Sequence, residues 1–331
     1  MAPAVPAPPI AASPETALVG DIGATNARFG LVAPDGAILH SETFGCADFA
    51  TIGEAIEAYF GHRGGLAMPR RGALAIAAPI TGGDRIRMTN HPWSFSVAGL
   101  RDMLGFTRLE VINDFTAVAL AIPHLGETDR FGVGGGTPSE AMPVAVLGPG
   151  SGLGCSGLVR AANHWAALTA EGGHATMAAS NDRESAVLAE MRRHFDHVSA
   201  ERCLSGPGLV NLYQSLATLD GVPAASYTAA QITDPEIGAQ DLLCREATAM
   251  FCAMLGTVAG NLALTLGAQG GVYIAGGIVP RLGARFGQSE FRARFEAKGR
   301  MRAYLAAIPT YVITHPLVAF LGCAAALAES I

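Results

Sequence analysis

Two segments of the chain begin with the same succession of elements: a short apolar strand, a glycine-containing turn and two further strands. In the first segment the strands are ALVG, RFGLV and AILHSETF, with DIGATNA after the first and a Pro34-Asp35-Gly36 turn before the third. In the second they are PVAVLG, CSGLVR and HWAALTA, with PGSGLG after the first. Strands joined by tight turns are typical of an antiparallel meander. The repeat therefore predicts an internal duplication.

Helices and buried strands follow each meander. In the first half the pattern predicts a helix at 49–60, a strand at 73–80, a helix at 96–104, a strand at 108–114 and another helix. The second half adds helices at about 183–195, 207–217 and 239–267, strands at 270–278 and 310–315, and a closing helix. We therefore expect an α/β fold of two lobes built on βββαβαβα units, with a ligand cleft between the lobes.

The composition excludes several classes of protein. Half of the 331 residues are hydrophobic, which is enough for a large core and fits two domains better than one. Only 15% are charged and the net charge is -6, so nothing indicates a surface for nucleic acid. The most apolar long stretch, residues 248–266, contains Gly256 and Gly260 and fits a buried helix better than a membrane span.

The first 15 residues, MAPAVPAPPIAASPE, are rich in alanine and proline. They lack the basic start and the sustained apolar run of a signal peptide. We interpret them as a disordered tail and expect a cytoplasmic protein. The six cysteines fit that compartment, because they form no C-x-x-C pair, and Cys244 and Cys252 are expected in the core.

The single lysine, Lys298, excludes two kinds of ATP site. A Walker A loop requires Gly-Lys-Ser/Thr, and a protein-kinase strand requires V-A-I-K; the sequence contains neither. If the protein uses ATP, its loops must hold the phosphates without a lysine.

The turn after the first strand is suited to a phosphate ligand. Glycine lets a ligand approach the backbone, and exposed N–H groups can meet phosphate oxygens. Asp21 could orient hydrated Mg²⁺, while Thr25 and Asn26 offer neutral donors. The same residue types also form ordinary hairpin turns, so this turn alone fits either interpretation. Its candidate ATP-binding residues are Gly20, Asp21, Ile22, Gly23, Ala24, Thr25 and Asn26.

The second turn, GPGSGLG at 148–154, favours the phosphate interpretation. It has four glycines and a hydroxyl, and it occupies the matching place in the second half. Two such turns facing each other across a cleft would hold a polyphosphate from both sides. The candidate ATP-binding residues here are Gly150, Ser151 and Gly152.

A dinucleotide fingerprint is the rival interpretation of this turn. Residues 152–157 match G-x-G-x-x-G, and Glu171 follows 19 residues after the first glycine. A Rossmann unit needs a helix between the glycines and the next strand, whereas residues 158–163 read as strand and turn. The context therefore argues against a Rossmann site.

A third glycine cluster brackets the buried strand VYIA. Gly270 and Gly271 precede it, and Gly276 and Gly277 follow it. Glycines at the end of a buried strand let a flat ligand approach the backbone. Close packing of helix on sheet explains them equally well.

Asn113 and Asp114 stand where the strand at 108–114 gives way to a helix. An acid in this place can cap the helix, or it can take a proton from a substrate. A carboxylate held by helix N–H groups has a lowered pKa and is a poorer base. The sequence leaves both roles open.

Three more polar residues are candidates for binding hydroxyl groups. Glu171 and His174 surround two glycines in AEGGHATMA, and they could bind adjacent hydroxyls of a sugar. A metal pair lacks an obvious third ligand, and a lone histidine is often structural. Glu201 precedes a helix and could be a helix N-terminal charge or a further hydroxyl acceptor.

These motifs together resemble a known family. DIGATNARFGLV resembles the first phosphate loop, D-x-G-x-T, of the sugar kinase, actin and Hsp70 superfamily. LGPGSGLG resembles its second phosphate loop, and GGVYIAGGIVPRL its adenosine loop. VINDFTAVALAIP, AEGGH, ERCLSGPGLVNLY, MTNHPW and GGIVPR look more narrowly like the bacterial ATP-dependent glucokinase family. The resemblance runs from about Ala17 to the C-terminus.

The resemblance implies a two-lobed actin-like ATPase fold and transfer of the γ-phosphoryl of ATP to the 6-hydroxyl of glucose, a step of glycolysis. By likeness, Asp114 is the general base, and Asn113, Glu171, His174 and Glu201 also bind glucose. The implied domains are a tail at 1–15, a small lobe at 16–124 plus 310–331, and a large lobe at 125–309.

The resemblance also implies the ligands and the assembly of the protein. We expect Mg-ATP, with Asp21 binding Mg²⁺ through water, and a homodimer with no membrane partner. Relatives with a structural zinc carry a cysteine-rich motif that this chain lacks, so no zinc is expected. Ala24 and Ser151 depart conservatively from the usual glycine and threonine. The alternatives are a kinase for another hexose and a sugar-sensing regulator of the same fold.

Overall fold

The computed structural model describes residues 15–62, 68–161 and 164–328. The chain divides into two compact units: residues 1–121 with 317–331, and residues 122–316. The tail predicted at 1–15 lies outside the described residues, apart from Glu15.

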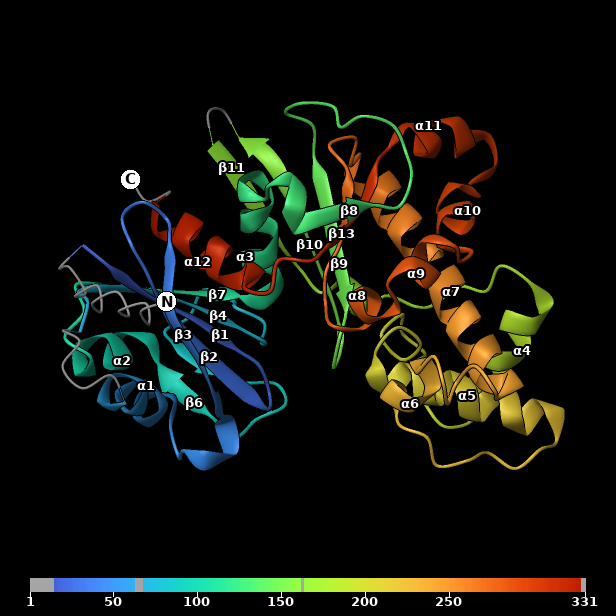
Figure 1. The fold of residues 1–331 in the computed structure, drawn as a ribbon, viewed down its shortest axis with the longest axis horizontal. Coiled ribbons are helices and arrows are strands. Elements are labelled where there is room, and N and C mark those ends of the chain that lie inside the picture. The colour runs from blue at the N-terminus through green and yellow to red at the C-terminus, as the bar shows by residue number, and fades with distance from the viewer. Residues whose placement is uncertain (1–14, 63–67, 162–163, 329–331) are drawn as a thin grey trace, which may run out of the picture. The chain divides into compact units, whose positions relative to one another are not determined.

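The first unit contains a five-stranded sheet in the order β3-β2-β1-β4-β7 (Figure 1). Its strands are β1 (Ala17–Ile22), β2 (Asn26–Val32), β3 (Ile38–Gly45), β4 (Arg71–Ile76) and β7 (Arg108–Asn113). The first three form the predicted antiparallel meander, and β4 and β7 add to it in parallel with β1. A separate hairpin consists of β5 (Arg85–Arg87) and β6 (Ser94–Ser96).

Both faces of this sheet are buried, because side chains alternate along its strands. Leu18 and Ile22 face one core, which includes residues of α1 (Ile52–Gly61) and α2 (Val97–Met103). Ala17 and Val19 face the other, which includes residues of α3 (Asp114–Ala121) and α12 (Val318–Ala328). Figure 1 shows the two helix pairs on opposite faces of the sheet.

Helices α3 and α12 pack backbone against backbone. A Cβ placed on Gly322 of α12 would lie 1.8 Å from the carbonyl oxygen of Ala117 in α3, so only glycine fits there. Small residues such as Ala319 line the same core. The contact fixes the position of α3, the helix that begins at Asp114.

The second unit contains a six-stranded sheet in the order β11-β10-β9-β12-β13-β8. Its strands are β8 (Arg130–Gly132), β9 (Val144–Pro149), β10 (Leu153–Ala161), β11 (His164–Ala170), β12 (Val272–Ile274) and β13 (Thr310–Ile313). Apart from β8, the order repeats that of the first sheet: a three-stranded meander and two added parallel strands. The predicted duplication is confirmed.

The final strand does not lie where the expected domain boundaries put it. β13 pairs with β12 and β8 in the second sheet, so residues 310–316 belong to the second unit, and only α12 returns to the first. The duplication explains this placement, since β13 is the second sheet's counterpart of β7. The first boundary falls after Ala121 and not after residue 124.

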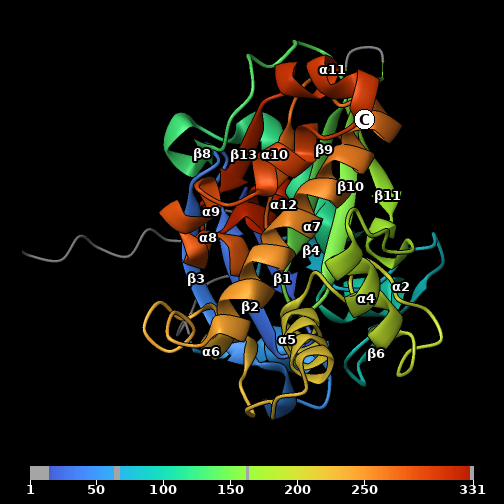
Figure 2. The same cartoon turned by 90° about the vertical axis from the view of Figure 1, so that its right-hand side faces the viewer.

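The helices of the second unit pack around α7 (Leu242–Leu266), with α5 (Gly206–Asp220) and α6 (Ala229–Thr233) near its start and α10 (Phe291–Glu296) further along (Figure 2). The remaining helices are α4 (Asp182–Met191), α8 (Ile278–Leu282), α9 (Ala284–Gly287) and α11 (Arg302–Ala307). Short 3₁₀ turns occur at Cys46–Asp48, Ile122–His124, Glu127–Asp129, Gly172–His174 and Gly299–Met301.

Among the described residues, α7 is the one helix long and apolar enough to cross a membrane by length and composition. It also runs through the core of the second unit, where 61% of its most apolar stretch is buried. The expected core positions of Cys244 and Cys252 are confirmed, since both lie on α7 as buried free thiols.

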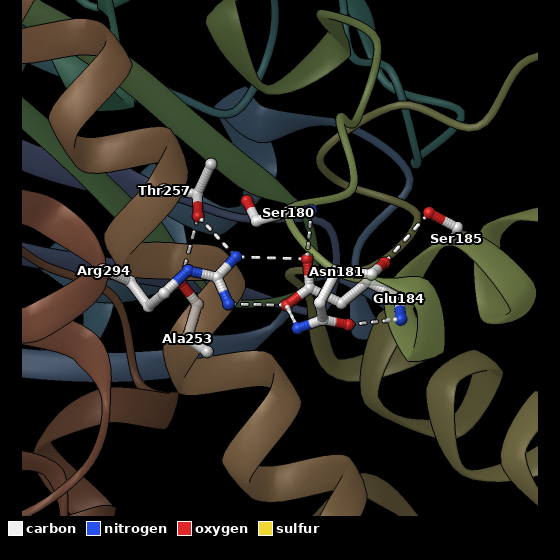
Figure 3. Close-up of polar contacts among 7 residues, drawn as sticks. All are labelled: Ser180, Asn181, Glu184, Ser185, Ala253, Thr257 and Arg294. Atoms are coloured by element: carbon white, nitrogen blue, oxygen red, sulfur yellow. Dashed lines mark hydrogen bonds and ion pairs between the residues drawn. The ribbon is translucent and has the colours of Figure 1, made fainter. Parts of the chain in front are cut away.

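A buried ion pair joins three helices of this unit (Figure 3). Arg294 of α10 donates two hydrogen bonds to Glu184 of α4, over 2.7 and 3.1 Å, and another over 3.0 Å to Thr257 of α7. Glu184 also accepts from the N–H of Ser180 and from the side chain of Asn181, the N-cap of α4. Glu184 is 2% exposed, so the pair fixes the start of α4 in the interior.

Candidate active site

A turn joins β1 and β2, as the sequence predicts, but it is shorter than expected and consists of Gly23, Ala24 and Thr25. Asp21 lies at the end of β1 and Asn26 at the start of β2. The N–H of Gly23 donates to the carbonyl of Asn26 over 2.9 Å, and the N–H of Cys46 donates to the carbonyl of Thr25 over 2.8 Å. Thr25 and Asn26 are exposed. The turn is thus a closed hairpin whose polar side chains face solvent.

Asp21 precedes this turn and pairs across the ladder with Arg28. Burial raises the pKa of the Asp21 carboxyl, and the nearby charge of Arg28 partly opposes the rise. Gly20 is held closely, because a Cβ there would lie 2.6 Å from the Leu74 side chain. A poorly solvated carboxylate beside an exposed turn suits a hydrated cation, which would offset the cost of burying the charge.

Asn113 is the residue that caps α3. Its Oδ1 accepts from the N–H groups of Phe115 and Thr116, over 2.9 and 3.1 Å. This is the N-cap geometry that satisfies the first free amides of a helix. The sequence allowed Asp114 to be the cap of α3, but the structure shows that Asn113 is chiefly the capping residue.

Asp114 is oriented by two donors on one of its oxygens. Its Oδ1 accepts from the N–H of Phe115 and from Nδ2 of Asn113, both over 2.9 Å. The same Nδ2 donates to the carbonyl of Ala78 over 3.3 Å, which ties the pair to the segment after β4. The Asp114 carboxylate thus has a fixed direction at the N-terminus of α3, where a negative charge is favoured.

The first turn and the Asn113-Asp114 pair lie on one edge of the first sheet. In the parallel ladders, Ile22 of β1 is level with Ile76 of β4, and Ile76 is level with Asn113 of β7. Two strand spacings separate β1 from β7, a distance of about 10 Å. The topology therefore brings these two groups of candidate residues together.

The turn between β9 and β10 consists of Gly150, Ser151 and Gly152, and the N–H of Gly150 donates to the carbonyl of Gly152 over 2.8 Å. It is the counterpart of the first turn, at the same place in the duplicated sheet. Residues 153–157, which carry most of the G-x-G-x-x-G pattern, lie in β10 between two antiparallel partners. A strand in place of a helix confirms that the pattern is no Rossmann site.

Gly276 and Gly277 lie beside the second turn, at the carboxyl edge of the second sheet. β12 is the parallel neighbour of β9, and Gly276 adopts a φ of +81°. A Cβ on Gly276 would lie 2.3 Å from the carbonyl oxygen of Pro149. At Gly270 a Cβ would lie 2.6 Å from the carbonyl oxygen of Met142, so close packing accounts for that glycine.

Glu171 and His174 lie at the 3₁₀ turn after β11, with both side chains more than half exposed. His174 Nε2 is 4.0 Å from Glu171 Oε2. Burial and the charges of Glu171 and Glu201 raise the pKa of the Cys155 thiol to about 12. Both glutamates therefore lie near the same buried thiol.

Glu201 is not the cap of α5. Ser205 caps that helix by accepting from the N–H of Gly208, and its first turn contains no acidic residue. Instead Glu201 joins the 3₁₀ turn after β11 to the start of β10: its N–H donates to the carbonyl of Gly173, and its Oε2 accepts from the N–H of Leu153, each over 2.9 Å. Three of the five predicted sugar residues, Glu171, His174 and Glu201, are thus neighbours in the second unit.

Gly173 is a site residue whose role the sequence did not reveal. A Cβ there would lie 2.0 Å from the carbonyl oxygen of Leu153, so the EGGH segment can approach β10 only with glycine at this position. The two adjacent glycines of EGGH were the sequence feature that could have indicated this close approach. No group of three or more His, Cys, Asp or Glu side chains that could hold a metal ion occurs within the described ranges.

The sequence and the fold are similar to those of known proteins. The family model described as Glucokinase matches residues 18–330. The glucokinase of Paramagnetospirillum magneticum is 54% identical over 308 residues, which are 93% of this chain and 96% of that protein. A crystal structure of glucokinase from an Antarctic psychrotroph has a TM-score of 0.84 at 39% identity, covering 96% of this chain and 99% of the other.

A structure of a ROK family glucokinase from Streptomyces griseus, in complex with glucose and AMPPNP, has a TM-score of 0.62 and covers 93% of this chain and 98% of the other. At 17% identity it shows a likeness of fold alone. The duplicated sheets and their glycine turns define a sugar kinase of the two-lobed, actin-like fold. The chain belongs to the glucokinase family.

Proposed function

We propose that the protein is an ATP-dependent glucokinase. It transfers the γ-phosphoryl group of Mg-ATP to the 6-hydroxyl of glucose, and the products are glucose 6-phosphate and ADP. The observation that carries the proposal is the oriented Asn113-Asp114 pair on the same sheet edge as the first glycine turn. Membership of the glucokinase family supports the same assignment.

Asp114 acts as the general base. As the sugar oxygen forms its bond to the γ-phosphorus and the bond to the bridging oxygen of ADP breaks, the 6-hydroxyl proton passes to the Asp114 carboxylate. The two donors on Oδ1 hold the carboxylate in one direction, which suits proton transfer from a fixed hydroxyl. A base of this kind contributes on the order of 10²–10⁴ to the rate.

The other sugar residues set position and specificity. Asn113 binds a hydroxyl next to the reacting one, and Glu171, His174 and Glu201 bind hydroxyls on the far side of the ring. A site built from hydrogen bonds discriminates against a sugar that lacks one of the hydroxyls, because the buried partner is left unpaired. Glucose is the proposed substrate, ahead of other hexoses, because the relatives at 52–54% identity are glucokinases.

The glycine turns hold the nucleotide. The N–H groups of Gly23 and Gly150 are used within their turns, so those of Ala24 and Thr25 and those of Ser151 and Gly152 meet the phosphates. The segment at Gly276 and Gly277 takes the adenosine. Asp21 would hold Mg²⁺ through water, and the ion would supply positive charge that neutralises the transferred group. The fit rests on the raised pKa and partial burial of Asp21 beside an exposed turn. AMPPNP, the compound bound to the Streptomyces griseus structure, is an ATP analogue.

The direct test is product analysis with the purified protein. Glucose, ATP and MgCl₂ should give glucose 6-phosphate, identified by ³¹P NMR and by coupling to glucose-6-phosphate dehydrogenase. With mannose or fructose in place of glucose, the rate of phosphorylation should be at least about tenfold lower. The same should hold with ADP or polyphosphate as the phosphoryl donor in place of ATP. A protein that binds glucose and nucleotide without turnover would instead be a sugar sensor. We further propose that the protein is cytoplasmic and that it is a homodimer. Size-exclusion chromatography with light scattering tests the homodimer.

A further inference from the structure

Glu201 contacts the second glycine turn as well as the EGGH segment. Its Oε2 accepts from the N–H of Leu153, the residue that directly follows the turn, and its own N–H donates to the carbonyl of Gly173. Within the described part of the chain, the other oxygen, Oε1, has no hydrogen bond. One carboxylate can therefore hold the nucleotide turn with one oxygen and a sugar hydroxyl with the other.

Two glycines allow the segments around this carboxylate to approach each other closely. A Cβ on Gly152 would lie 2.4 Å from Glu201 Oε2, and a Cβ on Gly173 would lie 2.0 Å from the Leu153 carbonyl oxygen. At Gly173 the opposing atom is backbone, so only glycine permits that contact. At Gly152 the opposing atom is the Glu201 carboxylate itself, so a side chain there would push the carboxylate away from its place beside the turn. A movement of the Glu201 carboxylate must move the turn, or break its hydrogen bond to it.

The start of α5 belongs to the same hydrogen-bonded block. The N–H of Gly206 donates to the carbonyl of Gly150 in the turn, over 2.8 Å. The hydroxyl of Ser205 donates to the carbonyl of Glu201, also over 2.8 Å. The start of α5 thus holds the turn at Gly150, and Glu201 holds the chain at Leu153, just beyond the turn. Of these two contacts, the one from Glu201 involves a proposed sugar ligand.

We propose that Glu201 is a positioning residue that couples sugar binding to nucleotide binding. This inference rests on the proposed function, in which Glu201 binds a sugar hydroxyl. A sugar on Oε1 restrains the carboxylate, the carboxylate restrains Leu153, and the nucleotide then binds to a turn that is already ordered. Coupling between two ligands is reciprocal, so nucleotide must strengthen glucose binding by the same factor.

The test measures AMPPNP binding by isothermal titration calorimetry, with Mg²⁺, in the presence and absence of saturating glucose. The variant is Glu201→Ala, and the matched control is Glu171→Ala. Glu171 is another proposed sugar ligand, and its side chain contacts His174 at 4.0 Å and not the turn. Both variants should lose glucose affinity, and circular dichroism should show that both are folded.

The two variants should differ in nucleotide binding. Without glucose, Glu171→Ala should bind AMPPNP as the wild type does, and Glu201→Ala about fivefold or more weakly. With glucose at a saturating concentration, Glu171→Ala should keep the wild-type coupling factor, and Glu201→Ala should lose it. Couplings of this kind are typically about 5- to 150-fold. In Glu201→Gln an amide oxygen can still accept from Leu153, so nucleotide affinity should return to within about twofold of wild type.

The proposal is overturned if Glu201→Ala binds AMPPNP with wild-type affinity and coupling, or if Glu171→Ala loses as much as Glu201→Ala. If Glu201→Ala does not fold, the comparison of Glu201→Gln with Glu201→Asp replaces it. The shorter aspartate side chain withdraws from Leu153, whereas glutamine keeps the contact. Equal losses of nucleotide affinity in these two variants would contradict the role of this contact. If the wild type binds AMPPNP but not glucose, the proposed function fails instead, and the glucose-free titrations still report on the Glu201 contact.

Discussion

Gly322→Ala should displace the helix that carries Asp114. The new Cβ would lie 1.8 Å from the carbonyl oxygen of Ala117, whereas ordinary contact begins at 3.4 Å, so α12 and α3 must separate by about 1.6 Å. The opposing atoms are backbone and cannot rotate away. Overpacking of this kind typically costs about 1–3 kcal/mol, and a rigid backbone clash belongs at the upper end.

Scanning calorimetry measures the loss of stability. A cost of about 3 kcal/mol predicts a fall in Tm of roughly 6–12 °C for a unit of this size. Turnover should also fall, on the order of 10²-fold, because a shift of about 1 Å misplaces the base. The control is Gly61→Ala, the same substitution at a helical position of the same unit, where nothing lies within 4 Å of the new Cβ.

Gly61→Ala should leave turnover unchanged and stabilise the protein by up to about 1 kcal/mol, because alanine is the better helix former. A Gly322→Ala variant that melts within about 2 °C of the wild type would refute a rigid contact between α12 and α3. It is also refuted if the two substitutions have the same effect. Either result would mean that α12 does not fix α3.

Two further substitutions follow from the buried charges. Asp21→Asn should raise the Tm of the ligand-free protein, because burial raises the folded-state pKa of Asp21 and its ionised form is therefore destabilising at neutral pH. The same substitution should lower turnover, because the proposed ligand for hydrated Mg²⁺ is lost. This gain in Tm should shrink as the pH falls through the folded-state pKa and vanish below the unfolded value; a gain that persists at pH 3 would contradict it. Arg294→Met leaves Glu184 buried and unpaired, so urea denaturation should show a loss of about 3–5 kcal/mol. Removing Arg101 from its exposed pair with Asp102 should cost less than about 1 kcal/mol, and equal losses would contradict the role of burial.

The local part of the fold could be predicted from the sequence. Period-two alternation and the turns DIGATN and GPGSGLG were enough to place both meanders, because hairpin pairing depends on neighbouring residues. The partner of a parallel strand is not encoded locally. The strand at 310–313 could equally extend either sheet, and only the ladder with β12 decides that it belongs to the second.

The candidate site was predictable in its residues but not in their contacts. Asn113 and Asp114 are both common capping residues, so the sequence could not say which of them caps α3. The hydrogen bonds of Asn113 to Phe115 and Thr116 settle that point. The contact between Glu201 and Leu153 joins residues 48 positions apart and has no local signal.

The measurement that tests the account most directly compares Asp114→Asn with the wild type in the coupled assay for glucose 6-phosphate. An asparagine keeps an oxygen to accept from Phe115 and Asn113, so fold and glucose affinity should stay within about threefold of wild type. Only the base is lost, and kcat should fall on the order of 10²-fold or more. A variant that folds, binds glucose and keeps near wild-type kcat would contradict the central claim that Asp114 takes the proton from the sugar.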